Sequence, residues 1–231
     1  MDAPPRLLRA ADFPPGGVLL VSGSTGAGHR IAARAVEGEL LQQEIPVLHV
    51  DAYAFLPPAV RWVYTELHFH LLEFTPWVYG PLFDLGSQSP ALARLHAHLV
   101  VRSRRAFEEV LGRVRPAVVL ATHPLGCALA APLKRAWGFR LVVLTTDYRA
   151  NAFQVYPAVD RYCVSHAWTA ADLAAAGVLP DRVTVTGIPL RAQFDAVLDR
   201  AEAKRVLGLP SHRPLILLTR GGMAAGKETV A

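Results

Sequence analysis

Short apolar runs alternate with amphipathic stretches along most of the chain. The first two runs, at residues 18–21 and 46–51, flank a stretch at about 30–43 whose small apolar face suits packing on a sheet. Later runs cover residues 117–121, 141–144, 161–165 and 182–186, and helical patterns cover residues 89–114, 125–137 and 167–176. Because strand–helix–strand crossovers are right-handed, this order predicts an α/β fold, with a parallel sheet and helices on both of its faces.

A loop of small residues, 22–28, separates the first strand from the first helix, and His29 opens that helix. Its glycines allow a sharp turn and a close approach to a ligand, and the N–H groups at a helix start favour an anion or a hydroxyl that is losing its proton. A phosphate-binding P-loop would carry lysine where His29 stands. The glycine spacing of a dinucleotide site is reversed, although Asp51 stands about where a ribose-binding acid would. We interpret Gly26, Gly28 and His29 as a ligand site, and a tight turn with a capping histidine is the alternative.

Polar residues follow two later strands of the predicted sheet. His123 comes after the run at 117–121, and Asp147 comes after the run at 141–144. The carboxyl ends of parallel strands share one edge of the sheet, so both side chains are expected in the same crevice as His29. A loop histidine and a turn aspartate are the simpler readings.

An aromatic segment at about 53–85 interrupts the alternation. Trp62 and Tyr64 belong to it, and their surroundings are typical of an element that lies in a lipid headgroup layer or lines a lipid pocket. Packing of these rings on the sheet is the alternative. His68 and His70 are two residues apart and point to different faces of a helix, so they do not suggest a shared metal ion.

Composition narrows the class of protein. The chain has 231 residues, 52% of them hydrophobic and 19% charged, which is typical of a packed globular protein. Cys127 and Cys163 lie in segments that read as buried, so we expect reduced thiols and a cytosolic setting. The net charge of +5 suits anionic partners such as a membrane surface. No nucleic-acid-binding motif is present, and no apolar run is long enough to span a bilayer.

The pattern divides the chain into a tail (1–16), one α/β domain (17–190), a linker (191–213) and the beginning of a second domain (214–231). The last segment reads as a strand followed by a glycine loop that contains Gly221 and Gly222. One strand cannot form a domain. We therefore expect that the second domain is truncated or that its remainder is supplied from elsewhere.

Several motifs together carry a family resemblance. They are Gly26-Ala27-Gly28-His29, Thr122-His123-Pro124, Thr146-Asp147-Tyr148 and the segments 159–164 and 185–194. In this order they resemble the monogalactosyldiacylglycerol synthase and processive diacylglycerol glucosyltransferase family. The resemblance extends from about residue 18 to residue 194.

The resemblance implies a glycosyltransferase of GT-B architecture, in which two Rossmann-like domains bind a lipid acceptor and a nucleotide sugar. It implies hexosyl transfer from a donor such as UDP-galactose or UDP-glucose to diacylglycerol, with no cofactor and no metal. It also implies a cytoplasmic protein in peripheral contact with the cytoplasmic face of an anionic membrane. Nucleic acid is not an expected partner.

Site residues follow from the same resemblance. His29 matches the acceptor-side histidine, a candidate base, and Asp147 matches the aspartate of a T-D-[FY] motif. Both are expected to be catalytic residues. The acceptor side would also include Gly26, Gly28, His123, Trp62 and Tyr64, and the donor side Gly221 and Gly222.

The chain departs from the family at two positions. Relatives commonly carry histidine and tryptophan where this chain has Asn151 and Gln154, so acceptor positioning is expected to differ. Because most of the donor domain is missing, we expect no transferase activity from the chain alone. A lipid- or nucleotide-binding module without chemistry is the main alternative, and a dinucleotide-dependent oxidoreductase, suggested by Asp51, is a third.

Overall fold

One parallel sheet forms the centre of the protein. The computed structural model describes residues 13–24, 27–67, 70–71, 74–75, 77–78, 81, 89, 91, 100, 103–150, 152–194 and 198–217. The sheet has six strands in the order β2-β1-β3-β4-β5-β6, and every neighbouring pair is parallel. The strands are β1 Val18–Ser22, β2 Val47–Asp51, β3 Val118–Ala121, β4 Arg140–Leu144, β5 Arg161–Val164 and β6 Val183–Val185. The predicted α/β, Rossmann-like sheet is confirmed.

The strand order reverses at β1. From β1 the chain passes to β2 on one side, and the next strand, β3, pairs with β1 on the other side. Ser22 lies opposite Asp51, and Val21 lies opposite Ala121, so the three strands end at nearly the same level. Open α/β sheets bind ligands at such a reversal, outside the carboxyl ends of the strands. The loops after β1 and β3 therefore flank the expected ligand position.

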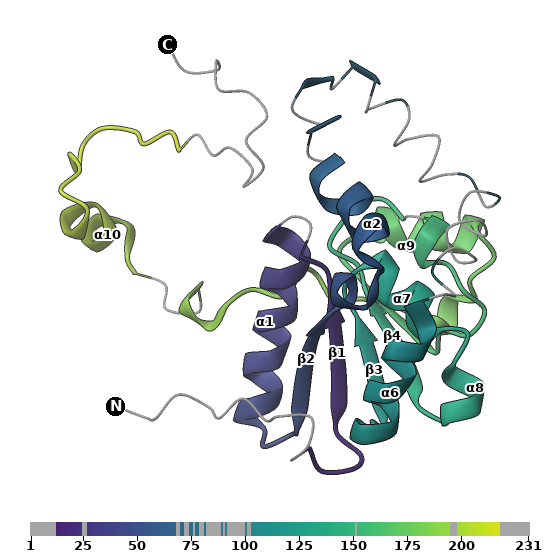
Figure 1. The fold of residues 1–231 in the computed structure, drawn as a ribbon. Helices are drawn as coiled ribbons and strands as arrows, with labels where there is room; N and C mark the ends of the chain where they lie inside the picture. Colours follow the sequence, from purple (N-terminus) through teal and green to yellow (C-terminus); the bar gives the residue numbers. More distant parts are fainter. Residues whose placement is uncertain are drawn as a thin grey trace.

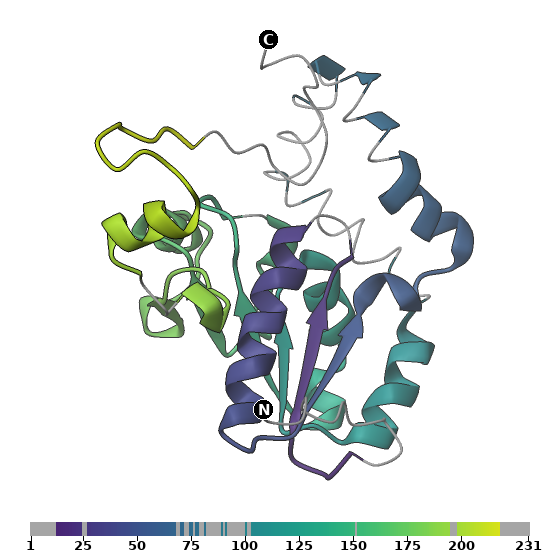
Figure 2. The same cartoon turned by 90° about the vertical axis from the view of Figure 1, so that its left-hand side faces the viewer.

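Helix α1 (Ala27–Gln42) covers one face of the sheet. It runs beside β1 and β2 in both views (Figure 1, Figure 2). Ala33 packs against a cluster formed by Val18, Leu20 and Val47. The helix already includes residues 27–29, so its first turn begins slightly earlier than the pattern predicted.

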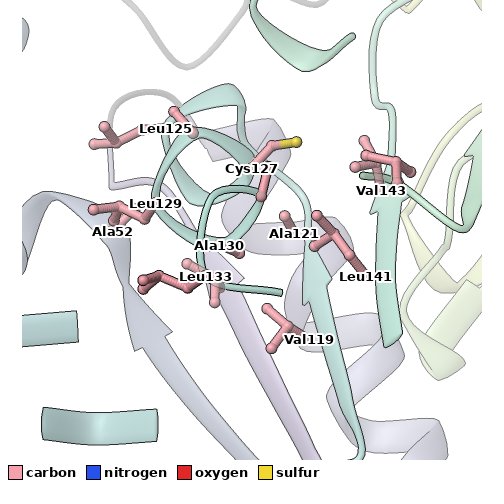
Figure 3. Packing of buried hydrophobic residues seen from close by; sticks show 14 of the residues in the cluster. Ala52, Val119, Ala121, Leu125, Cys127, Leu129, Ala130, Leu133, Leu141 and Val143 are labelled. Carbon is pink, nitrogen blue, oxygen red and sulfur yellow. The ribbon is translucent and has the colours of Figure 1, made fainter. Parts of the chain in front are cut away.

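Helices α6 (Arg104–Val114), α7 (Pro124–Ala130) and α8 (Lys134–Trp137) cover the opposite face (Figure 1). The main core lies between these helices and the sheet (Figure 3), and it includes Leu125 and Leu129 of α7 and Val119 and Ala121 of β3. These four side chains are almost completely buried. Helices thus cover both faces, as expected.

The prediction of one continuous helix at 125–137 is wrong. The structure has two helices there, α7 and α8, with a turn at residues 131–133 between them. Pro132 has no N–H to donate to a carbonyl one turn earlier, so a helix is interrupted at this point. Of the helix expected at 89–114, the structure describes α6 from Arg104 onward, and residues 90, 92–99 and 101–102 lie outside the described residues.

Shorter elements complete the description. They are η1 Ala52–Phe55, α2 Pro58–Trp62, the π-helical turn η2 Val63–Leu67, η4 Ala152–Gln154, α9 Ala167–Ala175, η5 Pro180–Arg182, η6 Ala192–Phe194 and α10 Arg200–Val206. In both views α2, part of the aromatic segment, stands beyond the carboxyl ends of the strands (Figure 1, Figure 2).

Two further expectations can be compared with the structure. Cys127 and Cys163 are free thiols, and Cys127 is fully buried, which confirms the reduced cysteines. Residues 215–217 are exposed and form no strand within the described part of the chain, and the glycine loop that follows them lies outside it. The second domain therefore stays a prediction.

Candidate functional site

His29 is fixed at the carboxyl edge of the sheet by residues from two strands. Its Nδ1 lies 2.6 Å from the carbonyl oxygen of Thr122, directly after β3, and 3.1 Å from the hydroxyl of Thr146, just after β4. The Thr122 hydroxyl in turn donates a hydrogen bond of 3.1 Å to the carbonyl oxygen of His29. The first turn of α1 is therefore joined to the ends of both strands.

These contacts assign the tautomer of the His29 ring. A carbonyl oxygen only accepts hydrogen bonds, so Nδ1 must carry the proton that it donates to Thr122. In the neutral ring Nε2 is then the unprotonated nitrogen, which can accept a proton. His29 is only partly buried. The geometry thus suits a general base at the edge of the sheet.

His123 lies beside His29 and caps α7. The two ring centroids are 4.7 Å apart in an edge-to-face arrangement. The Nδ1 of His123 accepts a hydrogen bond of 3.1 Å from the Leu125 N–H, so the neutral ring carries its proton on Nε2, which lies 3.3 Å from the Tyr53 hydroxyl. A Cβ atom at Gly23 would lie 2.6 Å from the His123 ring. The first glycine of the loop therefore makes room for this histidine.

Aromatic rings continue from His123 toward α2 and η2. Tyr53 lies 5.3 Å from the His123 ring and 6.2 Å from the Tyr64 ring, measured between centroids. Burial raises the pKa of the Tyr64 hydroxyl, so this group stays neutral. The Trp62 side chain, in contrast, is 55% exposed. The structure thus brings Tyr64 into the row of rings and leaves Trp62 at the surface.

Two further predicted site residues, Asp147 and Gly28, are exposed. Asp147 directly follows Thr146, its side chain is exposed, and its carbonyl oxygen accepts hydrogen bonds from Ser165 and Thr169. Gly28 is exposed in the first turn of α1, and a Cβ atom there would meet open space. Five residues that the sequence analysis names lie outside the described residues: Gly26, His68, Asn151, Gly221 and Gly222.

Three residues to which the sequence analysis gave no role help to build the site. Thr122 and Thr146 orient His29, and the sequence marked them only as members of the motifs that also contain His123 and Asp147. Tyr53 joins the two histidines to Tyr64. Asp51, considered above as a ribose ligand, instead accepts hydrogen bonds from the backbone N–H groups of Ser24 and Tyr53.

Gln154 is buried beside α7, and only 2% of it is exposed. Its backbone carbonyl accepts hydrogen bonds from Cys127 and Tyr162, whereas its side-chain amide contacts no hydrogen-bond partner in the described part of the chain. A buried unpaired amide costs about 1–3 kcal/mol. The side chain of Gln154 thus places an unpaired polar group in the core beside α7.

The described residues contain no group of three or more His, Cys, Asp or Glu side chains arranged to hold a metal ion. None of their helices has both the length and the apolar character needed to cross a bilayer.

Comparison with known proteins gives consistent matches. A family model described as monogalactosyldiacylglycerol (MGDG) synthase matches residues 29–190. A processive diacylglycerol beta-glucosyltransferase of Bacillus pumilus is 23% identical over 218 residues, which cover 88% of this chain and 53% of that protein. The chloroplastic monogalactosyldiacylglycerol synthase of Spinacia oleracea is 25% identical over 225 residues, covering 90% of this chain and 42% of that protein. The chain spans about half the length of these curated relatives.

Proposed function

The chain belongs to the monogalactosyldiacylglycerol synthase family, and from this premise we propose that it forms the acceptor side of an enzyme that transfers a hexosyl group from a nucleotide sugar to diacylglycerol. The observation that carries this proposal is the hydrogen bond from His29 Nδ1 to the Thr122 carbonyl oxygen at 2.6 Å. It leaves Nε2 as a proton acceptor beside the switch point of the sheet. An alcohol bound there meets a base that is already oriented.

The reaction would begin with the hydroxyl of diacylglycerol. Its proton moves to Nε2 of His29 as its oxygen attacks the anomeric carbon of the donor. The bond from that carbon to the nucleoside diphosphate breaks, and the diphosphate leaves with the electron pair. The imidazolium that forms keeps its hydrogen bond to Thr122 and lies beside Thr146. Asp147, exposed next to Thr146, would lie beside the bound acceptor.

The nucleotide sugar would be held by the second domain. In this proposal the glycine loop with Gly221 and Gly222 contacts the diphosphate through its backbone N–H groups, which stabilise the charge of the leaving group. No residue is assigned to a cofactor or a metal. Because the nucleotide sugar needs this second domain, a donor domain that completes the cleft is a proposed partner of this chain.

Lipid access would come from the aromatic segment. Trp62, Phe74 and Trp77 are 55%, 57% and 72% exposed, which is unusual for rings of this size. Exposed tryptophan at a membrane surface lies at the headgroup level, and the net charge of +5 would favour anionic lipid. We place the protein, as part of the proposal, in peripheral contact with the cytoplasmic face of a membrane.

A transfer assay tests this function. The chain is joined to the carboxyl-terminal half of the Bacillus pumilus relative and supplied with labelled UDP-glucose or UDP-galactose and with vesicles that contain diacylglycerol and anionic lipid. We expect no turnover by the chain alone, because donor contacts set the reacting geometry. We expect turnover by the joined protein, reduced at least about 100-fold by His29→Ala.

His212→Ala is the matched control, because His212 is exposed and lies in the segment that follows α10. This variant should keep full activity. Equal turnover by the His29→Ala variant would refute the role of this residue. A joined protein that binds the vesicles and transfers no sugar would favour the non-catalytic lipid-binding module.

A further inference from the structure

A second group of aromatic rings lies at the surface, at the carboxyl ends of β4 and β5. Tyr148 follows β4, His166 precedes α9, and Trp168 lies in the first turn of that helix. The ring centroids are 5.9 Å apart between Tyr148 and His166, and 4.5 Å apart between His166 and Trp168. Tyr148 is 56% exposed and Trp168 is 65% exposed. The three side chains, called here the ring surface, form a continuous row.

The loop that carries Tyr148 is tied to the start of α9. Ser165 and Thr169 both donate hydrogen bonds from their hydroxyls to the carbonyl oxygen of Asp147. The Asp172 carboxylate pairs with Arg149 at 2.7 Å and accepts the Ala150 N–H at 3.0 Å. These contacts hold the backbone on either side of the exposed rings in place, so ordering the rings on binding costs little conformational entropy.

The middle ring has a defined orientation. Nδ1 of His166 accepts a hydrogen bond of 3.2 Å from the backbone N–H of Trp168, so the His166 side chain caps α9. The neutral ring then carries its proton on Nε2, which is a hydrogen-bond donor. The Asp147 carboxylate, on the residue before Tyr148, adds an exposed acceptor. Flat apolar faces thus stand next to one donor and one acceptor.

The charge of this surface distinguishes among the ligands that stack on aromatic rings. A nucleotide or an anionic lipid headgroup needs a cation for its phosphate. Around Tyr148 the negative charges of Asp147 and Asp172 outnumber the positive charge of Arg149, whose side chain pairs with Asp172 and is 80% exposed. A pyranose ring is neutral, has a face of C–H groups that packs on aromatic rings, and has a rim of hydroxyls that both donate and accept hydrogen bonds. It matches the surface best.

The ring surface adjoins the proposed transfer site. Thr146, which contacts His29 at 3.1 Å, is two residues before Tyr148. We propose that Tyr148, His166 and Trp168 form a binding surface for a neutral hexopyranose ring beside the transfer site. The role of this surface in a reaction rests on the proposed function, whereas the binding of a sugar to the surface does not. The sugar would belong either to an acceptor lipid that already carries a hexose or to the donor.

Nuclear magnetic resonance titration tests the surface in this chain. Methyl β-D-glucopyranoside and methyl β-D-galactopyranoside are added while the indole N–H signals of the tryptophans and the ring signals of His166 are followed. On an open surface we expect a saturable shift of the Trp168 signal with a Kd in the millimolar range, on the order of 1–10 mM. Trp168→Ala should abolish the sugar-induced shift of the His166 ring signals. Trp168→Phe, which keeps an aromatic ring, should only weaken that shift.

Trp137→Ala is the matched control, because Trp137 is a partly exposed tryptophan that ends α8. Helix α8 lies toward the amino ends of the strands, away from α9 (Figure 1). This variant should bind the sugars as the parent does. Tyr148→Ala provides a second test if Trp168→Ala does not give a folded protein. Glucosylglycerol and UDP-glucose, compared with UDP, separate the two sources of the sugar, since the true source should bind more tightly.

Three results would overturn the proposal. They are the absence of a saturable shift with any of these sugars up to about 100 mM, an unchanged response in the Trp168→Ala variant, and a response of Trp168 to UDP or to anionic vesicles but not to neutral sugar. Sugar binding without transfer in the joined protein would refute the proposed function alone. Transfer without sugar binding at Trp168 would refute the ring surface alone.

Discussion

The two ring nitrogens of His29 have different tasks. Nδ1 is the one held against the Thr122 carbonyl and the Thr146 hydroxyl, so it orients the ring. Nε2 is left to exchange a proton with a ligand. A base whose second nitrogen is fixed in this way keeps one tautomer and one direction. The chemistry proposed for this site depends on that division.

Gly23, in the loop after β1, and Gly28, in the first turn of α1, are expected to respond in opposite ways to an added methyl group. In Gly23→Ala the new Cβ atom would lie 2.6 Å from the His123 ring, so the histidine or the loop must move. We expect a loss of about 1–3 kcal/mol in the free energy of unfolding, measured by urea denaturation. Gly28→Ala, whose Cβ atom meets nothing within 4 Å, should be neutral or gain about 0.5–1 kcal/mol, because alanine favours a helix. Equal losses in both variants would contradict this packing.

Sequence reasoning found part of the site at this scale. It placed His29 and His123 at one edge, because strand ends carry polar residues there, and their rings are 4.7 Å apart. It did not find the backbone carbonyl of Thr122 as the partner of His29, because every residue has a carbonyl and the pattern does not mark one. It also did not find that Gly23 accommodates a side chain, since that depends on a residue 100 positions later.

At the scale of elements, Asp160 joins α8 to two strands. One carboxylate oxygen accepts a hydrogen bond from Lys134 of α8 at 2.6 Å, and the other accepts the Leu141 N–H of β4 at 2.8 Å. Asp160 itself immediately precedes β5. Burial alone would raise the pKa of the Asp160 carboxyl, but these hydrogen bonds and the nearby cations lower it overall.

The lowered pKa gives this link a pH dependence. A carboxyl group whose pKa is lower in the folded state contributes its stability above its unfolded pKa, about 3.9, and loses it as the pH falls through the folded value. We expect Asp160→Asn to reduce the free energy of unfolding at pH 7 by about 0.5–1 kcal/mol, a small value because the ion pair is partly exposed. The difference from the parent should vanish as the pH falls well below 4. Denaturation curves at several pH values measure it, and a difference that grows in acid would contradict the account.

Elements were predicted better than their interruptions. The six predicted strand runs correspond to β1 to β6. The inner strands β1, β3 and β4 are nearly continuous apolar runs because helices cover both faces of the sheet there. The break between α7 and α8 was missed because the apolar pattern continues through Pro132, and the proline acts on the backbone rather than on the pattern. The ring surface was missed as well, since exposed aromatic residues resemble core residues in a sequence.

At the scale of the whole molecule, the strand order creates the site. The reversal at β1 places the connections after β1 and β3 on either side of the ligand position, and these connections lead to His29 in α1 and to His123 before α7. The sequence pattern predicted a parallel sheet, but apolar runs do not encode which strands become neighbours. The position of the switch point therefore required the structure.

One measurement tests the central claim, that His29 presents an unprotonated Nε2 at this edge. Nitrogen-15 spectra that detect long-range couplings of the imidazole rings report which nitrogen carries the proton, and His29→Ala assigns the signal. At a pH where the ring is neutral, we predict the tautomer with its proton on Nδ1, held by the Thr122 carbonyl. A ring with its proton on Nε2, or one that exchanges freely between both forms, would contradict the account.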